Sequence, residues 1–192
     1  MSAADLDAAK STLLAELREH SLVIGEVTLS SGAVAQYYVD ARRALLRPPG
    51  FLAAGELIAA AAVEAGAGAV GGPATAAIPL ACAAIAVEAG SDLAGFFVRN
   101  QRKEHGLQRW VEGAVGPGDR CIVVEDTVTS GGSTVAALER IREEGLEIAA
   151  VLAAVDRLAG GGETIEAAAG APFRALVTID ELYPDRPDRN VG

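Results

Sequence analysis

The chain has 192 residues, the size of one domain, and 51% of them are hydrophobic, enough to bury a sizeable core. With 26 acidic and 16 basic residues, its formal net charge is -10, which argues against general nucleic-acid binding because the phosphate backbone would be repelled. Both cysteines, Cys82 and Cys121, lie in apolar runs, a usage that fits a reducing cytoplasm rather than a disulfide scaffold. No basic and apolar leader is visible at the N-terminus, so we expect no secretory signal.

The N-terminal third predicts two helices with extended segments between them. Residues 3–20 form the first helix, because apolar residues recur there at helical spacing, at Leu6, Ala9, Leu13 and Leu17. Extended segments are expected around residues 27–29 and 37–40, separated by Ser-Ser-Gly at positions 30–32. A second helix is expected to start after the prolines at 48 and 49 and to end at residue 66.

An uncharged run between Glu64 and Glu88 is long enough to span a bilayer. Glycine or proline interrupts it at positions 66, 68, 71, 72, 73 and 79. Glycines and prolines at this density favour a series of short elements over one continuous helix, so we expect no membrane span.

From residue 67 onward, short strands alternate with helices. Four runs are apolar on both faces and predict buried strands, at 67–70, 93–98, 121–124 and 148–155. Helices are expected near 79–89 and 133–144. This alternation predicts an α/β fold with a parallel sheet, helices on both sides and a ligand beyond the carboxyl ends of the strands. Residues 184–192, rich in Pro, Asp and Arg, predict a loose tail.

The most informative motif covers residues 121–134. A buried strand leads to two adjacent carboxylates, Glu125 and Asp126, then to a hydroxyl- and glycine-rich turn at 127–133 and a helix that starts near Ser133. Glycines allow successive backbone N–H groups to point into one concavity, and the helix N-terminus adds a positive dipole end, which together suit a phosphate. Ionised carboxylates only accept hydrogen bonds and suit ribose hydroxyls. The motif therefore predicts a site for a ribose 5-phosphate.

Other interpretations of the glycine motifs are weaker. A Walker A loop needs a lysine that is missing from the turn at 127–133. Gly66, Gly68 and Gly71 match the spacing of a dinucleotide-binding fingerprint, but they follow a predicted helix and enter a strand. Gly66 is therefore expected to cap that helix, and an ordinary strand–turn–helix remains the plain alternative for 121–134.

A basic segment at residues 99–109 contrasts with the acidic chain, and it carries Lys103 and His105. Such a run is usually a solvated face. Beside a phosphate site it predicts a mobile basic loop, because cations stabilise the negative charge that develops on a departing polyanion.

The motif at 122–134 resembles the phosphoribosyl pyrophosphate (PRPP) motif of type I phosphoribosyltransferases. Three further motifs resemble the orotate phosphoribosyltransferase family: Leu29-Ser-Ser-Gly-x4-Tyr-Tyr-Val-Asp40, Arg99-x3-Lys103-x-His105-Gly106 and Val155-Asp-Arg157. The resemblance extends over residues 27–182. It implies the type I phosphoribosyltransferase fold, with a mainly parallel central sheet flanked by helices and a small N-terminal hood. Residues 1–183 would form one domain, with 1–45 contributing the hood over the base site, and 184–192 the tail.

The resemblance also implies a reaction. The enzyme, a pentosyltransferase, would transfer 5-phosphoribosyl from PRPP to orotate, giving orotidine 5'-monophosphate and pyrophosphate in cytoplasmic de novo pyrimidine (UMP) biosynthesis. Mg2+ would be carried by PRPP, with no direct protein ligand. A homodimer would share the mobile loop across subunits, with no nucleic-acid or membrane partner. The alternatives are transfer to another base and a non-catalytic PRPP-binding regulator.

Residue roles follow from the same resemblance. Lys103, His105 and Asp126 would be catalytic, the first two closing with Arg99 over the pyrophosphate. Glu125 and Asp126 would hold the ribose hydroxyls and face the positive charge of an oxocarbenium-like transition state. PRPP would be bound by Arg99, Asn100, Lys103, His105, Glu125, Asp126, Thr127, Val128, Thr129, Ser130, Gly131, Gly132 and Ser133. Orotate would be bound by Thr129, Arg157, Tyr37 and Tyr38.

Some alternatives and departures stay open at this point. Arg157 could instead pair with Asp156, and the two tyrosines could be strand core. The family often has lysine where this chain has Asn100, Ser30 and Ala76. Arg102 is a candidate to compensate for Asn100. Residues 71–79 fall at the pyrophosphate-contacting loop of the family.

Overall fold

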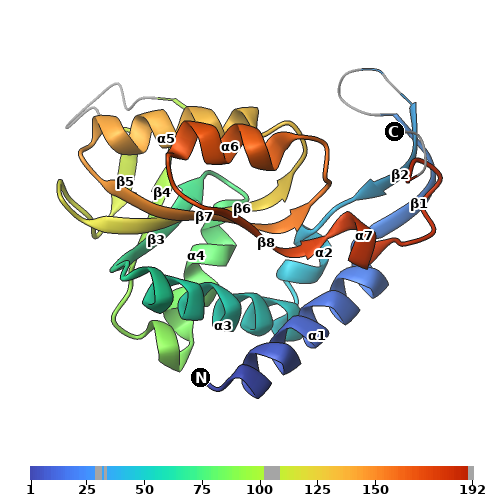
Figure 1. Ribbon diagram of the computed structural model, residues 1–192, viewed down its shortest axis with the longest axis horizontal. Helices are drawn as coiled ribbons and strands as arrows, with labels where there is room; N and C mark the ends of the chain where they lie inside the picture. Colours follow the sequence, from blue (N-terminus) through green and yellow to red (C-terminus); the bar gives the residue numbers. More distant parts are fainter. Residues whose placement is uncertain (29–31, 33, 102–108, 190–192) are drawn as a thin grey trace.

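The computed structural model describes residues 1–28, 32, 34–101 and 109–189 (Figure 1). Helix α1 (Ala3–His20) starts at a capping box, in which Ser2 and Asp5 satisfy each other's backbone N–H groups. Its apolar positions Leu13 and Leu17 are fully buried, as the spacing predicts. The helix leads into a two-stranded antiparallel sheet of β1 (Leu22–Thr28) and β2 (Val34–Val39).

A six-stranded sheet forms the centre of the molecule. Its strands are β3 (Ala69–Pro73), β4 (Ala94–Val98), β5 (Val111–Gly113), β6 (Arg120–Val128), β7 (Glu147–Asp156) and β8 (Phe173–Thr178). They lie in the order β5-β4-β3-β6-β7-β8, and every neighbouring pair is parallel except β4 and β5. After β4 and β5 the chain returns to the other side of β3, so the strand order reverses between β3 and β6. A ligand site is expected where these two strands end.

Helices cover both faces of this sheet (Figure 1). On one face lie α1, α3 (Pro48–Ala65) and α4 (Ala77–Ala86), and on the other α5 (Gly132–Glu143) and α6 (Gly161–Ala169). Strand β6 is apolar toward both layers, because Ile122 packs in one core cluster and Val123 in the other. The short elements are α2 (Arg42–Leu45), a 3-10 turn (Glu88–Gly90) and α7 (Ile179–Leu182). The predicted α/β class with helices on both sides of a mainly parallel sheet is confirmed.

The uncharged run between Glu64 and Glu88 divides into the end of α3, strand β3 and helix α4. Gly66 ends α3 in the left-handed conformation, which is the expected cap rather than part of a dinucleotide fingerprint. None of the helices in the described part of the chain combines the length and the apolar character needed to cross a membrane.

Several element boundaries differ from the sequence-based expectation. Strand β6 continues to Val128, and α4 starts at Ala77 and ends at Ala86 rather than covering 79–89. Strands β5 and β8 and helix α6 were not expected. The extension of β6 matters for function, because it places both predicted carboxylates within the strand, near its carboxyl end, rather than after it.

Candidate active site

The carboxyl end of β6 carries Glu125, Asp126 and Thr127 to the position where the strand order reverses. Beside it, β7 ends at Asp156 and is followed by Arg157, whose backbone N–H donates to the carbonyl of Val128 at 2.9 Å. The structure therefore brings the predicted ribose and base residues to one edge of the sheet.

Glu125 is almost fully buried and ties β6 to the first turn of α5. Its Oε2 accepts hydrogen bonds from Thr134 Oγ1 at 3.0 Å and from Ser133 Oγ at 3.3 Å. Burial, and secondly the charge of Asp126, raises the pKa of Glu125 to about 7. The group thus gains and loses its proton near neutral pH.

This raised pKa predicts a pH-dependent stability. The folded state binds the proton more tightly than the unfolded chain, where the pKa is 4.5, so stability is highest below that value and falls as pH rises through about 7. Replacing Glu125 with Gln removes this loss. As the pH rises from 4.5 to 8, the unfolding free energy of wild type should therefore fall by about 2 to 3 kcal/mol more than that of Glu125→Gln.

Denaturant unfolding at a series of pH values measures this difference. The matched control is Glu147→Gln at the exposed start of β7, which should follow the wild-type curve. Parallel curves of stability against pH for wild type and Glu125→Gln would contradict a raised pKa of Glu125.

Asp126 is half-buried near the carboxyl end of β6. Its Oδ1 accepts from the Thr127 N–H at 2.7 Å. Burial raises the pKa of Asp126, and the positive charge of Arg42 partly opposes that rise. Arg42 itself donates from Nε to Asp40 Oδ1 at 2.9 Å. Helix α2 thus brings a cation close enough to act on the Asp126 carboxylate.

Arg42 is a site residue that the sequence interpretation missed. The only sequence feature that could have indicated Arg42 is its position two residues after Asp40, the last residue of the N-terminal motif. A position in α2 does not by itself indicate a site, and only the fold brings Arg42 close enough for its charge to act on Asp126.

The turn between β6 and α5 is shorter than the expected 127–133. Thr127 and Val128 belong to β6, and Gly132 and Ser133 belong to α5, so the turn proper is 129–131. Thr129 and Ser130 are exposed there. The Thr127 hydroxyl is buried and has no hydrogen-bond partner within the described part of the chain.

Gly131 makes this tight turn possible. Its φ of 79° lies in the left-handed region, and a Cβ atom there would lie 2.9 Å from the carbonyl oxygen of Gly161. The turn therefore packs against the start of α6. The first N–H groups of α5 open on the same edge of the sheet as the carboxylates and can bind an anion.

Arg157 and Tyr37 meet beyond the carboxyl end of β7. The guanidinium of Arg157 lies over the Tyr37 ring, 5.0 Å from its centre. Asp156 accepts from the Leu158 N–H at 2.9 Å, and no ion pair links it to Arg157 among the residues that the structure describes.

The two tyrosines approach the site from different sides. Neighbouring side chains of a strand point to opposite faces, and only Tyr37 contacts Arg157. Tyr38 lies close enough to Arg42 to contribute to the raised pKa of that guanidinium, behind the larger effect of Asp40. Tyr37 is buried and Tyr38 half-buried.

The ends of the basic segment are fixed on the sheet. Arg99 follows β4, donates its backbone N–H to the Trp110 carbonyl at 2.9 Å and pairs with Glu112 on β5 at 3.4 Å. Arg140 of α5 donates to the Arg99 carbonyl at 2.8 Å and covers the Trp110 ring. Asn100 is exposed.

Other residues of the basic segment named above, Arg102, Lys103, His105 and Gly106, lie outside the described residues, as does Ser30. The predicted pyrophosphate loop lies at the end of β3, where the Ala74 N–H donates to the Val98 carbonyl at 2.8 Å. Ala76 stands directly before α4, and the Ala74–Thr75 peptide bond is cis.

No protein-family model matches the chain. It is 42% identical over 182 residues to the orotate phosphoribosyltransferase of Streptomyces avermitilis, covering 94% of this chain and 100% of the relative. The crystal structure of Mycobacterium tuberculosis H37Rv orotate phosphoribosyltransferase with Fe(III) dicitrate has a TM-score of 0.83 at 37% identity, covering 91% of this chain and 99% of that one. A PRPP complex of the M. tuberculosis enzyme has a TM-score of 0.78 at 33% identity, covering 91% and 98%.

The fold and the carboxylate–turn–helix site define a type I phosphoribosyltransferase. The likeness to the S. avermitilis relative extends over nearly the whole of both chains. This chain belongs to the orotate phosphoribosyltransferase family.

Proposed function

We propose that this enzyme transfers the 5-phosphoribosyl group of PRPP to orotate, giving orotidine 5'-monophosphate and pyrophosphate in de novo pyrimidine biosynthesis. One observation carries the proposal: Glu125 and Asp126 lie near the carboxyl end of β6, which leads into a glycine turn and the N-terminus of α5, and Arg157 is hydrogen-bonded to the last residue of that strand. The relative from M. tuberculosis has been crystallised with PRPP, which supports the same ligand here.

PRPP would lie across the carboxyl end of β6. The turn at 129–131 and the first N–H groups of α5 would hold the 5-phosphate, with Gly132 and Ser133 in that first turn and Val128 at the strand end. Asp126 would accept hydrogen bonds from the ribose hydroxyls through its carboxylate oxygens. The buried Thr127 hydroxyl, which lacks a partner among the described residues, supports a ligand that supplies one.

The two carboxylates would also act on the transition state. Positive charge develops on the ribose as its bond to pyrophosphate lengthens, and fixed negative groups nearby lower the energy of that state. Asp126, less buried than Glu125, would face the ribose most directly, while Glu125 would hold the strand end against α5. Lys103, Arg99 and His105 would stabilise the departing pyrophosphate, with Asn100 beside them.

The base would be held between the hood and β7. Arg157 offers a planar fork of donors that matches the carboxylate and carbonyl groups of orotate. Tyr37 would support that guanidinium, and Thr129 and Tyr38 would complete the base site. Residues 1–45 would then form a hood within one domain of residues 1–183.

Mg2+ would enter with PRPP. Among the described residues no group of three His, Cys, Asp or Glu side chains is placed to hold a metal. Mg2+ commonly keeps phosphate and water oxygens as ligands, so the oxygens of PRPP would carry it. The ion would neutralise pyrophosphate charge. A cytoplasmic homodimer that shares the basic loop completes the proposal, on the family resemblance alone.

The direct test is a spectrophotometric assay of orotate consumption with PRPP and Mg2+, run beside uracil and adenine. We expect loss of orotate only, and no loss without PRPP. Consumption of uracil or adenine in place of orotate would assign the enzyme to another base. Binding of PRPP without turnover of any base would assign the chain to a regulator.

A further inference from the structure

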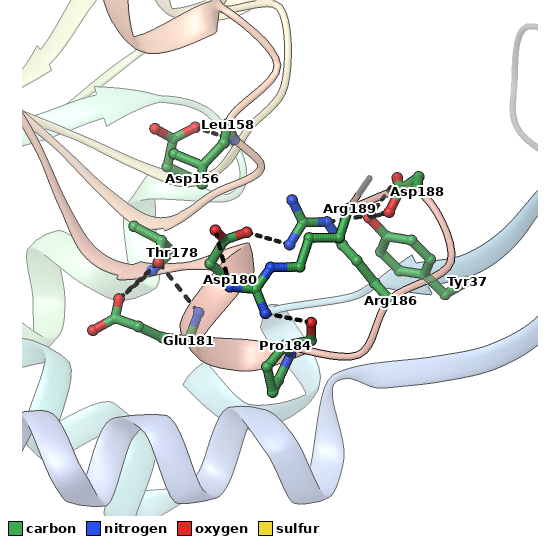
Figure 2. Close-up of polar contacts among 10 residues, drawn as sticks. All are labelled: Tyr37, Asp156, Leu158, Thr178, Asp180, Glu181, Pro184, Arg186, Asp188 and Arg189. Carbon is green, nitrogen blue, oxygen red and sulfur yellow. Dashed lines mark hydrogen bonds and ion pairs between the residues drawn. The ribbon is translucent and has the colours of Figure 1, made fainter. Parts of the chain in front are cut away.

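The chain that follows α7 returns to Tyr37 of β2, where Asp188 contacts the tyrosine hydroxyl (Figure 2). We call its described part, residues 184–189, the strap. The Tyr37 hydroxyl donates to the Asp188 carboxylate, at 3.0 Å to Oδ2 and 3.3 Å to Oδ1. A residue of the segment predicted as a loose tail thereby contacts the tyrosine that lies under the Arg157 guanidinium.

The strap is anchored by its own ion pairs. The Arg186 side chain is only 11% exposed; it pairs with Asp180 on α7, and its Nε lies 3.1 Å from Asp188 Oδ1. Arg189 closes the segment by donating to the Pro184 carbonyl at 2.7 Å, as Figure 2 shows. Asp188 is therefore fixed by Arg186 on one side while it accepts from Tyr37 on the other.

Charge in this cluster is balanced. Asp180 and Asp188 face Arg186 and Arg189, so the cluster does not add net negative charge beside an anionic base. Asp188 can therefore orient Tyr37 without repelling orotate. The sequence shows only a tail rich in Pro, Asp and Arg, and the pairing of its charges depends on the fold.

Tyr37 is held on three sides. Tyr183 packs edge-on against it, with ring centres 5.4 Å apart at 86°. Asp188 binds its hydroxyl, and Arg157 lies over its face. A phenol that donates to a carboxylate has a more electron-rich ring, which strengthens its attraction for a cation. The strap thus fixes both the direction and the strength of the Tyr37–Arg157 contact.

We propose that Arg186 and Asp188 are positioning residues for the base. They hold Tyr37, and through it the Arg157 guanidinium, in the orientation that receives the carboxylate-bearing edge of orotate. The proposal rests on the proposed function, because it assigns Arg157 to orotate. Its specific consequence is that the strap sets the KM for orotate and leaves PRPP binding unchanged.

Two variants test the contact from its two ends. Asp188→Ala removes the carboxylate, and Tyr37→Phe removes the hydroxyl but keeps the ring under Arg157. Because Asp188 is 56% exposed, water screens its interactions, and the effect stays moderate. We expect the KM for orotate to rise about fivefold in each, equal to about 1 kcal/mol, with kcat and the KM for PRPP within twofold of wild type.

The double variant Tyr37→Phe/Asp188→Ala should be no worse than either single variant, since both remove the same bond. Asp185→Ala is the matched control: it removes a carboxylate of the same strap that forms no hydrogen bond or ion pair with a described residue. A merely structural role would raise both KM values or lower the melting temperature and kcat together.

The outcomes separate this proposal from the one it rests on. Wild-type enzyme that does not consume orotate overturns the proposed function, and the strap's role with it. With wild-type turnover intact, an unchanged orotate KM in Asp188→Ala and Tyr37→Phe overturns the strap's role alone. An equal rise of the orotate KM in Asp185→Ala also overturns the strap's role. So does an orotate KM in the double variant that shows the effects of the two single variants added together.

Discussion

Asp126→Asn should lower kcat/KM for PRPP by about 100-fold. Asp126 lies near the end of the central strand and is half-buried, and the positive charge of Arg42 acts on its carboxylate. An amide of the same shape has lost the negative charge that would offset the developing positive charge on the ribose. It also offers one acceptor oxygen in place of two. Initial rates over a range of PRPP concentrations measure the loss.

Asp92→Asn is the matched control, because Asp92 is exposed in the turn before β4 and makes no hydrogen bond or ion pair with a described residue. It should retain wild-type kinetics. Thermal unfolding of each variant distinguishes a loss of chemistry from a loss of fold. An Asp126→Asn enzyme with kcat/KM within threefold of wild type would remove Asp126 from the proposed chemistry.

Gly72→Ala should destabilise the protein by about 3 kcal/mol. Gly72 lies in β3, where a Cβ atom would come within 2.1 Å of the Val124 carbonyl oxygen and 2.9 Å of Ala77 Cβ. Neither neighbour moves easily, because Val124 belongs to the central strand and Ala77 begins α4. The added methyl group must therefore push β3 away from β6 at the point next to Glu125.

Gly68→Ala provides the comparison within the same segment. Gly68 precedes β3, and a Cβ atom there meets no described atom within 4 Å. Denaturant unfolding should show a large loss for Gly72→Ala and a change within about 0.5 kcal/mol for Gly68→Ala. Equal stability of the two variants would contradict the close approach of β3 to β6.

The central strand and its motif were predictable from the sequence because their signals are local. A run that is apolar on both faces predicts a strand inside a parallel sheet, and the glycines and hydroxyls directly after Glu125 and Asp126 predict a turn into a helix. Burial of Leu13 and Leu17 likewise follows from helical spacing. These features depend on residues that lie a few positions apart.

Contacts between distant segments could not be predicted in the same way. Tyr37 and Asp188 are 151 positions apart, and the strap's composition predicts only a loose tail. The charge of Arg42 acts on Asp126 through the fold, which no local pattern indicates. Strand β5 has three residues, too few for an alternation of polar and apolar side chains to show. In each case the fold, rather than the neighbouring sequence, sets the contact.

The central claim is that this site joins orotate to the ribose of PRPP and releases pyrophosphate. Measuring pyrophosphate release and orotate consumption together, in wild type and in Lys103→Ala, tests it most directly. We expect equal amounts of the two in wild type, and loss of both in Lys103→Ala. Pyrophosphate release that does not depend on orotate, or PRPP binding without any pyrophosphate release in wild type, would contradict the claim.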